Sequence, residues 1–474
     1  DRMGIKPLYV HRHGDDIYFG SELKNLFEHP EIERRFNLTG LNLYLSLNYI
    51  PGNHTMVDGI EKLQPGHWLE WRDGHVTEDA YWRLQFDPHP IAPDGAKEEL
   101  DALLRSSIRE HLVSDVPLGV WSSGGLDSST IVHYASQEAG RQLKTFSVSF
   151  QGRSFDESPW FREIAKKYGT DHHEFDLHPE VELQEVIDQL PYYSDEPSSD
   201  AGAVPVWFLS KMTRRHVTVA LSGEGADELF GGYQTYLADN YASTLRALPK
   251  PLLKAGLGVT QLLPVSDDKI SFEYKAKRLL EGSLLPPNEA HFFWNGTWSS
   301  SQRRHLLLPA AYRNVSLPHS DDFLYIDQLH YLPDDILYKT DRMSMAHSLE
   351  VRPPFLDHRI VEFAARLPRD LKIRGSKLKW ILRELMRDKL PESVLTRSKQ
   401  GFDIPTHHWF RTILKPLLLD TINRESVEAM GIFSWPAVHR VISDHLDRRA
   451  NYGYHLWGLL MLFLWRTRWS IGRP

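Results

Sequence analysis

The feature of this 474-residue chain that most constrains its fold is an alternation of short strand-like runs with helix-like segments after residue 95. The runs are rich in β-branched and aromatic residues and read GVWSS (119–123), KTFSVSF (144–150), HHEFDL (172–177) and VTVALS (217–222). The segments between them carry apolar residues three and four positions apart, which is typical of amphipathic helices. This alternation predicts an α/β domain with a parallel sheet and flanking helices.

Two other regions differ from this pattern. Residues 1 to about 84 hold turn signals and short alternating runs such as HWLEWRDGHV, which indicates a β-rich unit. The segment DPHPIAPDG (87–95) contains three prolines and is the predicted linker. From about residue 235 onward the pattern is mostly helical. Because 474 residues exceed one ordinary hydrophobic core, we expect two domains.

Glycines, hydroxyls and an acid share the turn SSGGLDSS, which ends the first strand-like run. In an open parallel sheet, ligands bind beyond the carboxyl ends of the strands, where backbone N–H groups at helix N-termini favour anions. Gly124 and Gly125 would let the main chain approach a phosphate closely. The predicted hydroxyl donors are Ser123, Ser128 and Ser129. A carboxylate beside phosphate needs a bridging hard cation, so Asp127 predicts Mg²⁺.

The structural alternative for this turn is a glycine turn capped by serine. The presence of glycines, hydroxyls and acid in one strand-to-helix turn favours a phosphate site instead. The chain contains neither the GxxxxGKS/T motif of Walker-type nucleotide sites nor a GxGxxG dinucleotide fingerprint.

A second glycine-rich turn follows another predicted strand, in VTVALSGEGADELFGGY (217–233). It places Glu224, Asp227 and Glu228 close together, which is costly unless the carboxylates share a cation. A metal, ammonia or an ammonium-bearing substrate could be that cation. The alternative is a solvated acidic turn before a helix, and the flanking glycines favour a binding site over it.

The segment 331–364 sets many charges among apolar residues at helical spacing. We expect these charges to be paired at the wall of a cleft, namely Lys339, Asp341, Arg342, Glu350 and Arg352. Surface ion pairs on an amphipathic helix would account for some of them, although each such pair contributes about 1 kcal/mol or less.

Charge and cysteine content exclude several classes of protein. The net charge is −8 and no long basic run is present, which disfavours a nucleic-acid or anionic-membrane partner. The absence of cysteine excludes disulfides and thiolate metal sites and is compatible with a cytoplasmic protein. No signal peptide or long apolar span is visible, and HLWGLLMLFLWRTRW (455–469) predicts a buried helix. Asp1 falls inside a predicted strand, so we expect the chain to be a fragment of a longer protein.

The SGGLDSS turn resembles the pyrophosphate-binding loop of the N-type ATP pyrophosphatases, which cleave ATP to AMP and pyrophosphate. Over nearly its whole length, the chain also resembles the asparagine synthetase family of the glutamine-hydrolysing type, called class B. The motifs that carry this resemblance are DRMGIKPLY, FGSELKNLF, KLQPGHWLEW, SGGLDSS, LSGEGADELFGGY, DRMSMAHSLEVRPPFLD, RSKQGFDIP and LWGLLMLFLW.

The resemblance implies two domains. Residues 1–84 would be the C-terminal part of a class II glutamine amidotransferase domain, a β-rich remnant of the Ntn-type glutaminase fold. Residues 95–474 would be the asparagine synthetase domain, an ATP pyrophosphatase domain similar to the adenine nucleotide α-hydrolases.

The resemblance also implies the roles of individual residues. The ATP-binding residues would be Trp121, Ser123, Gly124, Gly125, Asp127, Ser128, Ser129, Val148, Ser222, Gly223 and Lys379. Main-chain groups at Trp121 and Val148 would face adenine, and Asp127 and Asp227 would reach Mg²⁺. Lys379 could equally be a surface lysine. The catalytic residues would be Glu224 as the base, Glu350 as its supporting partner, and Lys399 as a mobile cation.

The implied reaction joins aspartate and ammonia at the expense of ATP. The β-carboxylate of aspartate attacks the α-phosphorus of ATP and gives an acyl adenylate and pyrophosphate. Ammonia then attacks the activated carbonyl, and a base removes a proton from the adduct. Members of the family release that ammonia from glutamine with an amino-terminal cysteine, which this chain lacks. We therefore expect the chain as written to use only free ammonia. A homodimer is expected by analogy alone.

Several alternatives remain open. Relatives of the family close β-lactam rings or macrolactams, or amidate other acids, with the same adenylation loops. Glu224 favours an external ammonia acceptor over ring closure. An inactive regulatory pseudoenzyme would be expected to lose phosphate-loop residues, and a tRNA-modifying pyrophosphatase would be expected to carry a basic stripe. A zinc site in DHHEFDLH (171–178) is not predicted, because the spacing between its histidines differs from that of HExxH.

Overall fold

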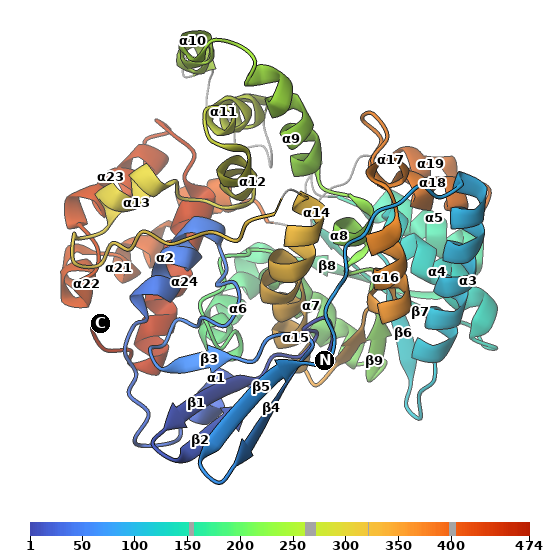
Figure 1. Ribbon diagram of the computed structural model, residues 1–474, viewed down its shortest axis with the longest axis horizontal. Coiled ribbons are helices and arrows are strands. Elements are labelled where there is room, and N and C mark those ends of the chain that lie inside the picture. The colour runs from blue at the N-terminus through green and yellow to red at the C-terminus, as the bar shows by residue number, and fades with distance from the viewer. Residues whose placement is uncertain (151–155, 261–271, 321, 398–403) are drawn as a thin grey trace.

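The computed structural model describes residues 1–150, 156–260, 272–320, 322–397 and 404–474. Its centre is a five-stranded sheet with the strand order β10-β9-β6-β7-β8, in which every neighbouring pair is parallel (Figure 1). The strands are β6 (Leu118–Trp121), β7 (Lys144–Phe150), β8 (Asp171–Leu177), β9 (Val219–Leu221) and β10 (Glu350–Arg352). The predicted parallel sheet with flanking helices is confirmed. The four runs singled out in the sequence form four of its five strands.

Helices cover both faces of this sheet. They include α3 (Pro93–His111), α4 (Leu126–Glu138), α5 (Ser158–Tyr168), α6 (Pro179–Tyr193), α7 (Ala203–Arg214) and α16 (His358–Arg366). Val219 and Leu221 of β9 share a hydrophobic core with α3, α4 and α16, whereas Ala220 between them belongs to the core on the α7 side. Since successive side chains of a strand point to opposite faces, this continuous apolar run requires cover on both sides.

The N-terminal region is β-rich, as its alternating runs predict, and it also contains helices. Its elements are β1 (Tyr9–His13), β2 (Asp16–Gly20), α1 (Leu23–Leu26), α2 (Leu38–Leu47), β3 (Ile60–Lys62), β4 (His67–Arg72) and β5 (His75–Ala80). The first three strands form an antiparallel sheet in the order β2-β1-β3, and β4 pairs with β5 in a hairpin. Asn37 caps α2 by accepting hydrogen bonds from the N–H groups of Thr39 and Gly40.

The segment 82–92 contains no helix or strand, whereas the last three residues of the predicted linker (87–95) begin α3. It lies along α16, where the Trp82 indole donates a hydrogen bond to Glu362 at 2.9 Å and the His89 N–H donates one to the Arg366 carbonyl at 3.1 Å. The segment therefore runs over the surface of the α/β unit and is anchored to it.

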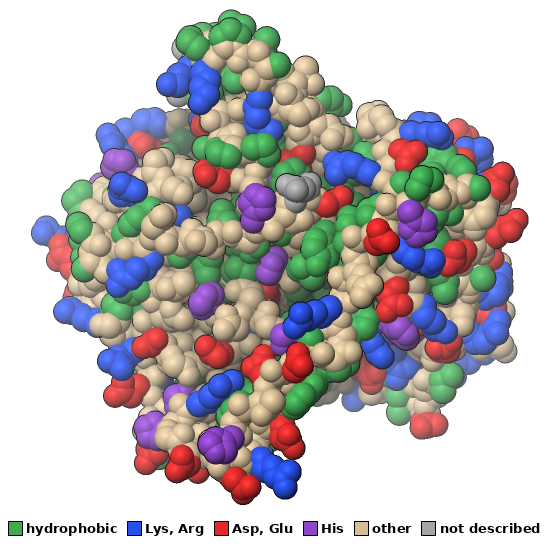
Figure 2. Space-filling model, viewed as in Figure 1, with side chains coloured by type: hydrophobic (Ala, Val, Ile, Leu, Met, Phe, Trp, Pro, Cys, Tyr) green, Lys and Arg blue, Asp and Glu red, His purple; other side chains and the backbone are tan. Residues whose placement is uncertain are grey.

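The rest of the chain is mostly helical. Its elements are α8 (Ala226–Phe230), α9 (Gln234–Leu245), α10 (Lys250–Thr260), α11 (Phe272–Ser283), α12 (Pro287–Asn295), α13 (Ser300–Leu306), α17 (Arg369–Lys372), α18 (Trp380–Met386), α19 (Glu392–Thr396), α20 (Thr406–Arg411), α21 (Lys415–Thr421), α22 (Arg424–Met430), α23 (Trp435–Leu446), α24 (Gly453–Trp469) and the short 3₁₀ helix η2 (Pro354–Leu356). Helix α10 projects from the molecule, and hydrophobic side chains gather at its tip (Figures 1 and 2).

Helix α24 is the predicted buried helix near the C-terminus. Eleven of its 17 residues are buried, and it packs against the N-terminal region, where the Tyr44 hydroxyl donates a hydrogen bond to the Gly458 carbonyl at 2.8 Å. None of the helices within the described ranges is long and apolar enough to span a bilayer.

One continuous helical segment, residues 323–345, runs between the N-terminal region and the α/β unit. It consists of α14 (Phe323–Ile326), the π-helix η1 (Asp327–Leu337) and α15 (Tyr338–Met345). A π-helix of this length is rare, and shorter π-turns are frequent at functional sites. Asp334 faces the N-terminal region and binds the Lys62 ammonium at 2.5 Å. Lys339 contacts Asp200, which lies just before α7 of the α/β unit.

Candidate active site

The loop after β6 is folded so tightly that Gly124 cannot be replaced. Its φ of +70° is unfavourable for other residues, and a Cβ atom would lie 2.5 Å from the Phe161 nitrogen and 2.6 Å from the Trp160 carbonyl carbon. The loop also organises its own hydroxyls: Ser123 Oγ accepts from the Gly125 N–H at 3.3 Å and lies 3.1 Å from Ser128 Oγ. A rigid, glycine-lined turn therefore precedes the N-terminus of α4.

Three buried serine hydroxyls near the carboxyl ends of β6 and β9 have no hydrogen-bond partner among the described residues. They are Ser122, Ser129 and Ser222. Ser122 and Ser222 directly follow two neighbouring strands of the sheet, and Ser129 lies in the first turn of α4. Buried polar groups without partners cost free energy, so this end of the sheet is suited to a polar ligand.

The two glycine-rich turns of the sequence meet at this end. A Cβ atom on Gly223 would lie 3.0 Å from both Asp127 Cβ and the Ser128 nitrogen. The structure thus brings the turn after β9 against the turn after β6, as expected for loops at the same edge of a parallel sheet.

Lys379 joins the acids of the two turns. Its Nζ atom lies 2.5 Å from Asp127 Oδ2 and 2.6 Å from Asp227 Oδ1, and the side chain is buried. Burial lowers the pKa of Lys379, but Asp127 and Asp227 raise it by more, so the pKa lies above its ordinary value. Gly232 packs directly against this group, since a Cβ atom there would lie 1.8 Å from Asp227 Oδ1 and 2.2 Å from Lys379 Cε.

Glu224 borders a small recess beside this group. The recess is lined by Ser222, Glu224, Thr340, Asp341 and Val351, and by Ile5 of the N-terminal region. Burial lowers the pKa of the neighbouring Lys339, but Asp200, Asp335 and Glu224 together raise it above its ordinary value. The ammonium group of Lys339 therefore interacts electrostatically with the carboxyl groups of Asp200, Asp335 and Glu224 next to the recess.

The sequences of known proteins were compared with this chain. The family model described as asparagine synthase matches residues 99–467, and the model described as a glutamine amidotransferase domain matches residues 1–82. The chain belongs to the asparagine synthetase family.

Three relatives illustrate the range of this family. The glutamine-hydrolyzing asparagine synthetase 1 of Bacillus subtilis (strain 168) is 32% identical over 98% of this chain and 74% of its own length. Asparagine synthetase 3 of the same organism is 30% identical over 87% of this chain and 67% of its own length. The amidase chry2 of Gibberella zeae is 25% identical over 95% of this chain and 74% of its own length.

The structure places the other residues that the asparagine synthetase resemblance implied. Trp121 is buried at the end of β6, where its indole N–H donates to Thr213 Oγ1 at 3.0 Å, and Val148 is buried in the neighbouring strand β7. Lys399 lies outside the described residues.

Glu350 is not brought together with Glu224. It begins β10 at the opposite end of the sheet from Ser222, is exposed, and pairs with Arg352 Nε at 2.6 Å. Val351, the next residue, lines the recess, and successive side chains of a strand point to opposite faces. The pairing of Glu350 with Arg352 matches the surface alternative for this segment, whereas Lys339, Asp341 and Arg342 are buried pairs.

Sequence reasoning missed Arg397 as a neighbour of the first loop. Its Nη1 donates to the Ser123 carbonyl at 3.4 Å, its Nη2 contacts Glu157, and its guanidinium lies 4.1 Å from the centre of the Trp160 ring. Arg397 opens the RSKQGFDIP motif, from which the resemblance implied only Lys399, and it contacts a loop about 270 residues earlier in the chain.

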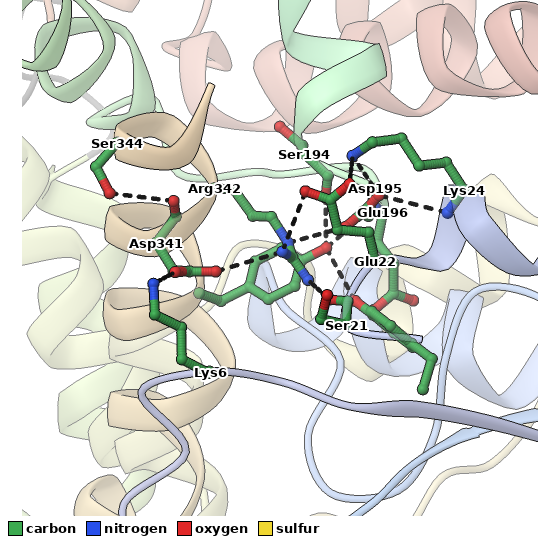
Figure 3. Close-up of polar contacts among 12 residues, drawn as sticks. Lys6, Ser21, Glu22, Lys24, Ser194, Asp195, Glu196, Asp341, Arg342 and Ser344 are labelled. Atoms are coloured by element: carbon green, nitrogen blue, oxygen red, sulfur yellow. Dashed lines mark hydrogen bonds and ion pairs between the residues drawn. The ribbon is translucent and has the colours of Figure 1, made fainter. Parts of the chain in front are cut away.

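A buried polar cluster joins the recess to the N-terminal region (Figure 3). Asp341, which lines the recess, contacts Lys6, and Arg342 binds Asp195 through Nε at 2.9 Å. Asp195 also binds the Lys24 ammonium at 3.0 Å. The N-terminal region thus contacts the candidate active site through charged groups, of which Asp195, Asp341 and Arg342 are buried and Lys6 is partly exposed.

Proposed function

We propose that this chain is an ATP-dependent ligase that forms asparagine, AMP and pyrophosphate from aspartate, ATP and ammonia through a β-aspartyl adenylate. The observation that carries this proposal is the convergence of the two glycine-rich turns on Asp127, Lys379 and Asp227. That arrangement offers anion donors and cation ligands within one buried site, as binding of magnesium–ATP requires. Family membership supports the choice of reaction.

We assign the nucleotide to the end of the sheet at β6 and β9. Gly124, Gly125 and Gly223 leave room for phosphates against the main chain. The hydroxyl donors are Ser123, Ser128, Ser129 and Ser222. Trp121 and Val148 are assigned to the adenine side through their main-chain groups. The unpartnered buried hydroxyls of Ser129 and Ser222 fit this assignment.

Asp127 and Asp227 fit a magnesium ion. Both present a carboxylate oxygen to the same point, which a cationic nitrogen of Lys379 holds in this structure. Mg²⁺ bound there would neutralise the charge of the triphosphate and of the departing pyrophosphate. Lys399 remains our proposed mobile cation, and it lies outside the described residues.

We propose that Glu224 is the base of the second step. It borders the recess next to the phosphate loops, where ammonia attacking the acyl adenylate must lose a proton. Glu224 lies close enough to the buried Lys339 for its charge to raise the pKa of that lysine. Glu350 is not part of this assignment, because its side chain pairs with Arg352.

We assign residues 1–84 to the amidotransferase domain and residues 95–474 to the synthetase domain. The 474 residues contain no cysteine, so free ammonia is the nitrogen source that we propose for them. A homodimer remains a prediction.

Pyrophosphate release tests the proposed reaction. With ATP, Mg²⁺ and ammonia, aspartate should release pyrophosphate and yield asparagine, and other carboxylic acids should not. Amidation of another carboxylic acid is the second candidate. Release with a different acid and none with aspartate would establish that alternative.

Glu224→Gln tests the proposed base. The variant should still release pyrophosphate on adenylation, whereas asparagine formation should fall about 100-fold or more, which is the usual contribution of a general base. Unchanged asparagine formation would exclude Glu224 from this role. Glu362→Gln, on the surface helix α16, is a suitable control and should leave both steps unchanged.

A further inference from the structure

We propose that Lys379 is an internal cation that holds Asp127 and Asp227 together when no metal is bound, and that Mg²⁺ must displace its ammonium group to bind. The inference rests on the proposed function, because it assumes that these two carboxylates are the magnesium ligands. It adds a second, metal-free state of the same site and a competition between two cations.

The contact distances make the two cations compete for the same two carboxylate oxygens. One Lys379 nitrogen lies 2.5 Å from an oxygen of Asp127 and 2.6 Å from an oxygen of Asp227. Mg²⁺ binds oxygen at about 2.0–2.1 Å, so an ion that used both oxygens would occupy nearly the position of the nitrogen. The ammonium nitrogen and a metal ion cannot occupy the same position, and two positive charges that close would repel each other.

The backbone around Lys379 is arranged to present this side chain. Lys379 has a φ of +51° and caps the N-terminus of α18. This left-handed conformation is uncommon for a residue with a Cβ atom and costs about 1 kcal/mol or more. Its N–H donates to the Gly231 carbonyl at 3.3 Å. Strain that the surrounding structure maintains is typical of functional positions.

The space around the ammonium group is also fixed. Gly232 passes so close that a Cβ atom would overlap both Asp227 Oδ1 and Lys379 Cε. Lys379 is only 4% exposed, so water does not screen its contacts. Without a cation, two carboxylates at this distance in a buried site would repel each other. A lysine in this position removes that cost in the metal-free protein.

Manganese binding without nucleotide tests the competition directly. Free Mn²⁺ can be counted by electron paramagnetic resonance in the wild type, in Lys379→Met and in the control Lys372→Met. Lys372 is a buried lysine on α17 that contacts neither carboxylate. We expect Lys379→Met to bind Mn²⁺ at least about tenfold more tightly than the wild type, and Lys372→Met to bind it like the wild type. Equal affinities in Lys379→Met and the wild type would overturn the proposal.

Thermal unfolding gives a second readout. Lys379→Met should melt below the wild type without metal, and millimolar Mg²⁺ should recover most of the difference, since the ion replaces the missing charge. If Lys379→Met cannot be purified folded, Lys379→Gln, which keeps an N–H donor, is used in the same way. Variants that unfold both with and without Mg²⁺ would overturn the proposal, because the lysine would then have a role that a metal cannot replace.

A double variant separates failure of this inference from failure of the proposed function. Mn²⁺ binding by Lys379→Met should be lost when Asp127→Asn is added, which would place the ion between the two carboxylates. Absence of Mn²⁺ binding in every variant, also with a non-hydrolysable ATP analogue present, would count against the proposed function itself. Tight binding by the wild type and Lys379→Met alike, with loss on Asp127→Asn, would leave the function intact and refute only the displacement of Lys379.

Discussion

Asp195→Asn is the sharpest test of the cluster that joins the N-terminal region to the active-site helix. Asp195 is fully buried and binds Arg342 at 2.9 Å and Lys24 at 3.0 Å. Its φ is +54°, a conformation that asparagine also tolerates well. The substitution therefore removes the charge and leaves the backbone and the side-chain volume almost unchanged.

The expected loss of stability follows from the partners that remain. Burial raises the pKa of Asp195, although Arg342 and Lys24 lower it, so the carboxylate itself gains little from its position. Burial also disfavours the charged form of Arg342 and so lowers its pKa, but Asp195 and its other neighbours raise that pKa well above its ordinary value. Arg342 is thus the group that depends on the pair. Breaking a buried pair in this way costs about 3–5 kcal/mol, and we expect the lower end because Asp341 stays 3.3 Å from Arg342.

Urea unfolding followed by circular dichroism measures this loss. The matched control is Glu33→Gln, which breaks the pair of Glu33 and Arg35 at 2.6 Å, where both side chains are more than half exposed. Such surface pairs contribute about 1 kcal/mol or less, so the control should unfold almost like the wild type. A free energy of unfolding for Asp195→Asn within about 1 kcal/mol of the wild type would refute the reasoning.

Two further substitutions test other parts of the structure. Burial raises the pKa of Glu196 to about 7, although Lys62 and the Met56 N–H lower it. Between pH 4.5 and 7 the folded protein therefore binds more protons than the unfolded chain. Its stability consequently falls as the pH rises through that window. Glu196→Gln should remove about 3 kcal/mol of the fall measured by urea unfolding between pH 5 and 8; an unaltered pH dependence would contradict the assignment. Gly232→Ala should lower pyrophosphate release at least about 100-fold, since its Cβ would lie 1.8 Å from Asp227 Oδ1, whereas Gly95→Ala, with nothing within 4 Å of its Cβ, should retain activity. Comparable activity in both variants would show that the contact at Gly232 is unimportant.

The sheet was predictable because its strands leave a local signal. Four strands are β-branched or aromatic runs, and β6 and β9 are buried on both faces, which forces that composition. Strand β10 was missed because it has only three residues, two of them charged, and pairs with β9 far away in the chain. Helix α2 was missed for a different reason: eight of its ten residues are buried, so no apolar stripe with a helical period distinguishes it from other buried segments.

The candidate site was predictable where loops follow strands, and not where distant segments meet. The turns at Gly124 and Gly223 were found because the carboxyl ends of parallel strands share one edge. Lys379 could be assigned only to ATP or to the surface, because it lies 252 residues from Asp127 in the chain. Its burial between two acids depends on where α18 packs, which no local pattern records. The partnership of Glu350 with Glu224 was implied by the family resemblance alone, and the pairing of Glu350 with Arg352 at the start of β10 does not support it.

The helical segment 323–345 contacts both the N-terminal region and the α/β unit, so its number of residues is constrained by both contacts. Each residue advances an α-helix by about 100° and the wider π-helix by somewhat less, so inserting or deleting one residue near Pro333 would rotate everything beyond it by roughly a quarter of a turn. The same insertion or deletion would break both the Asp334–Lys62 pair and the Lys339–Asp200 pair. Changes in this segment should therefore preserve its residue count, with variation confined to side chains, even where the surrounding loops differ in length.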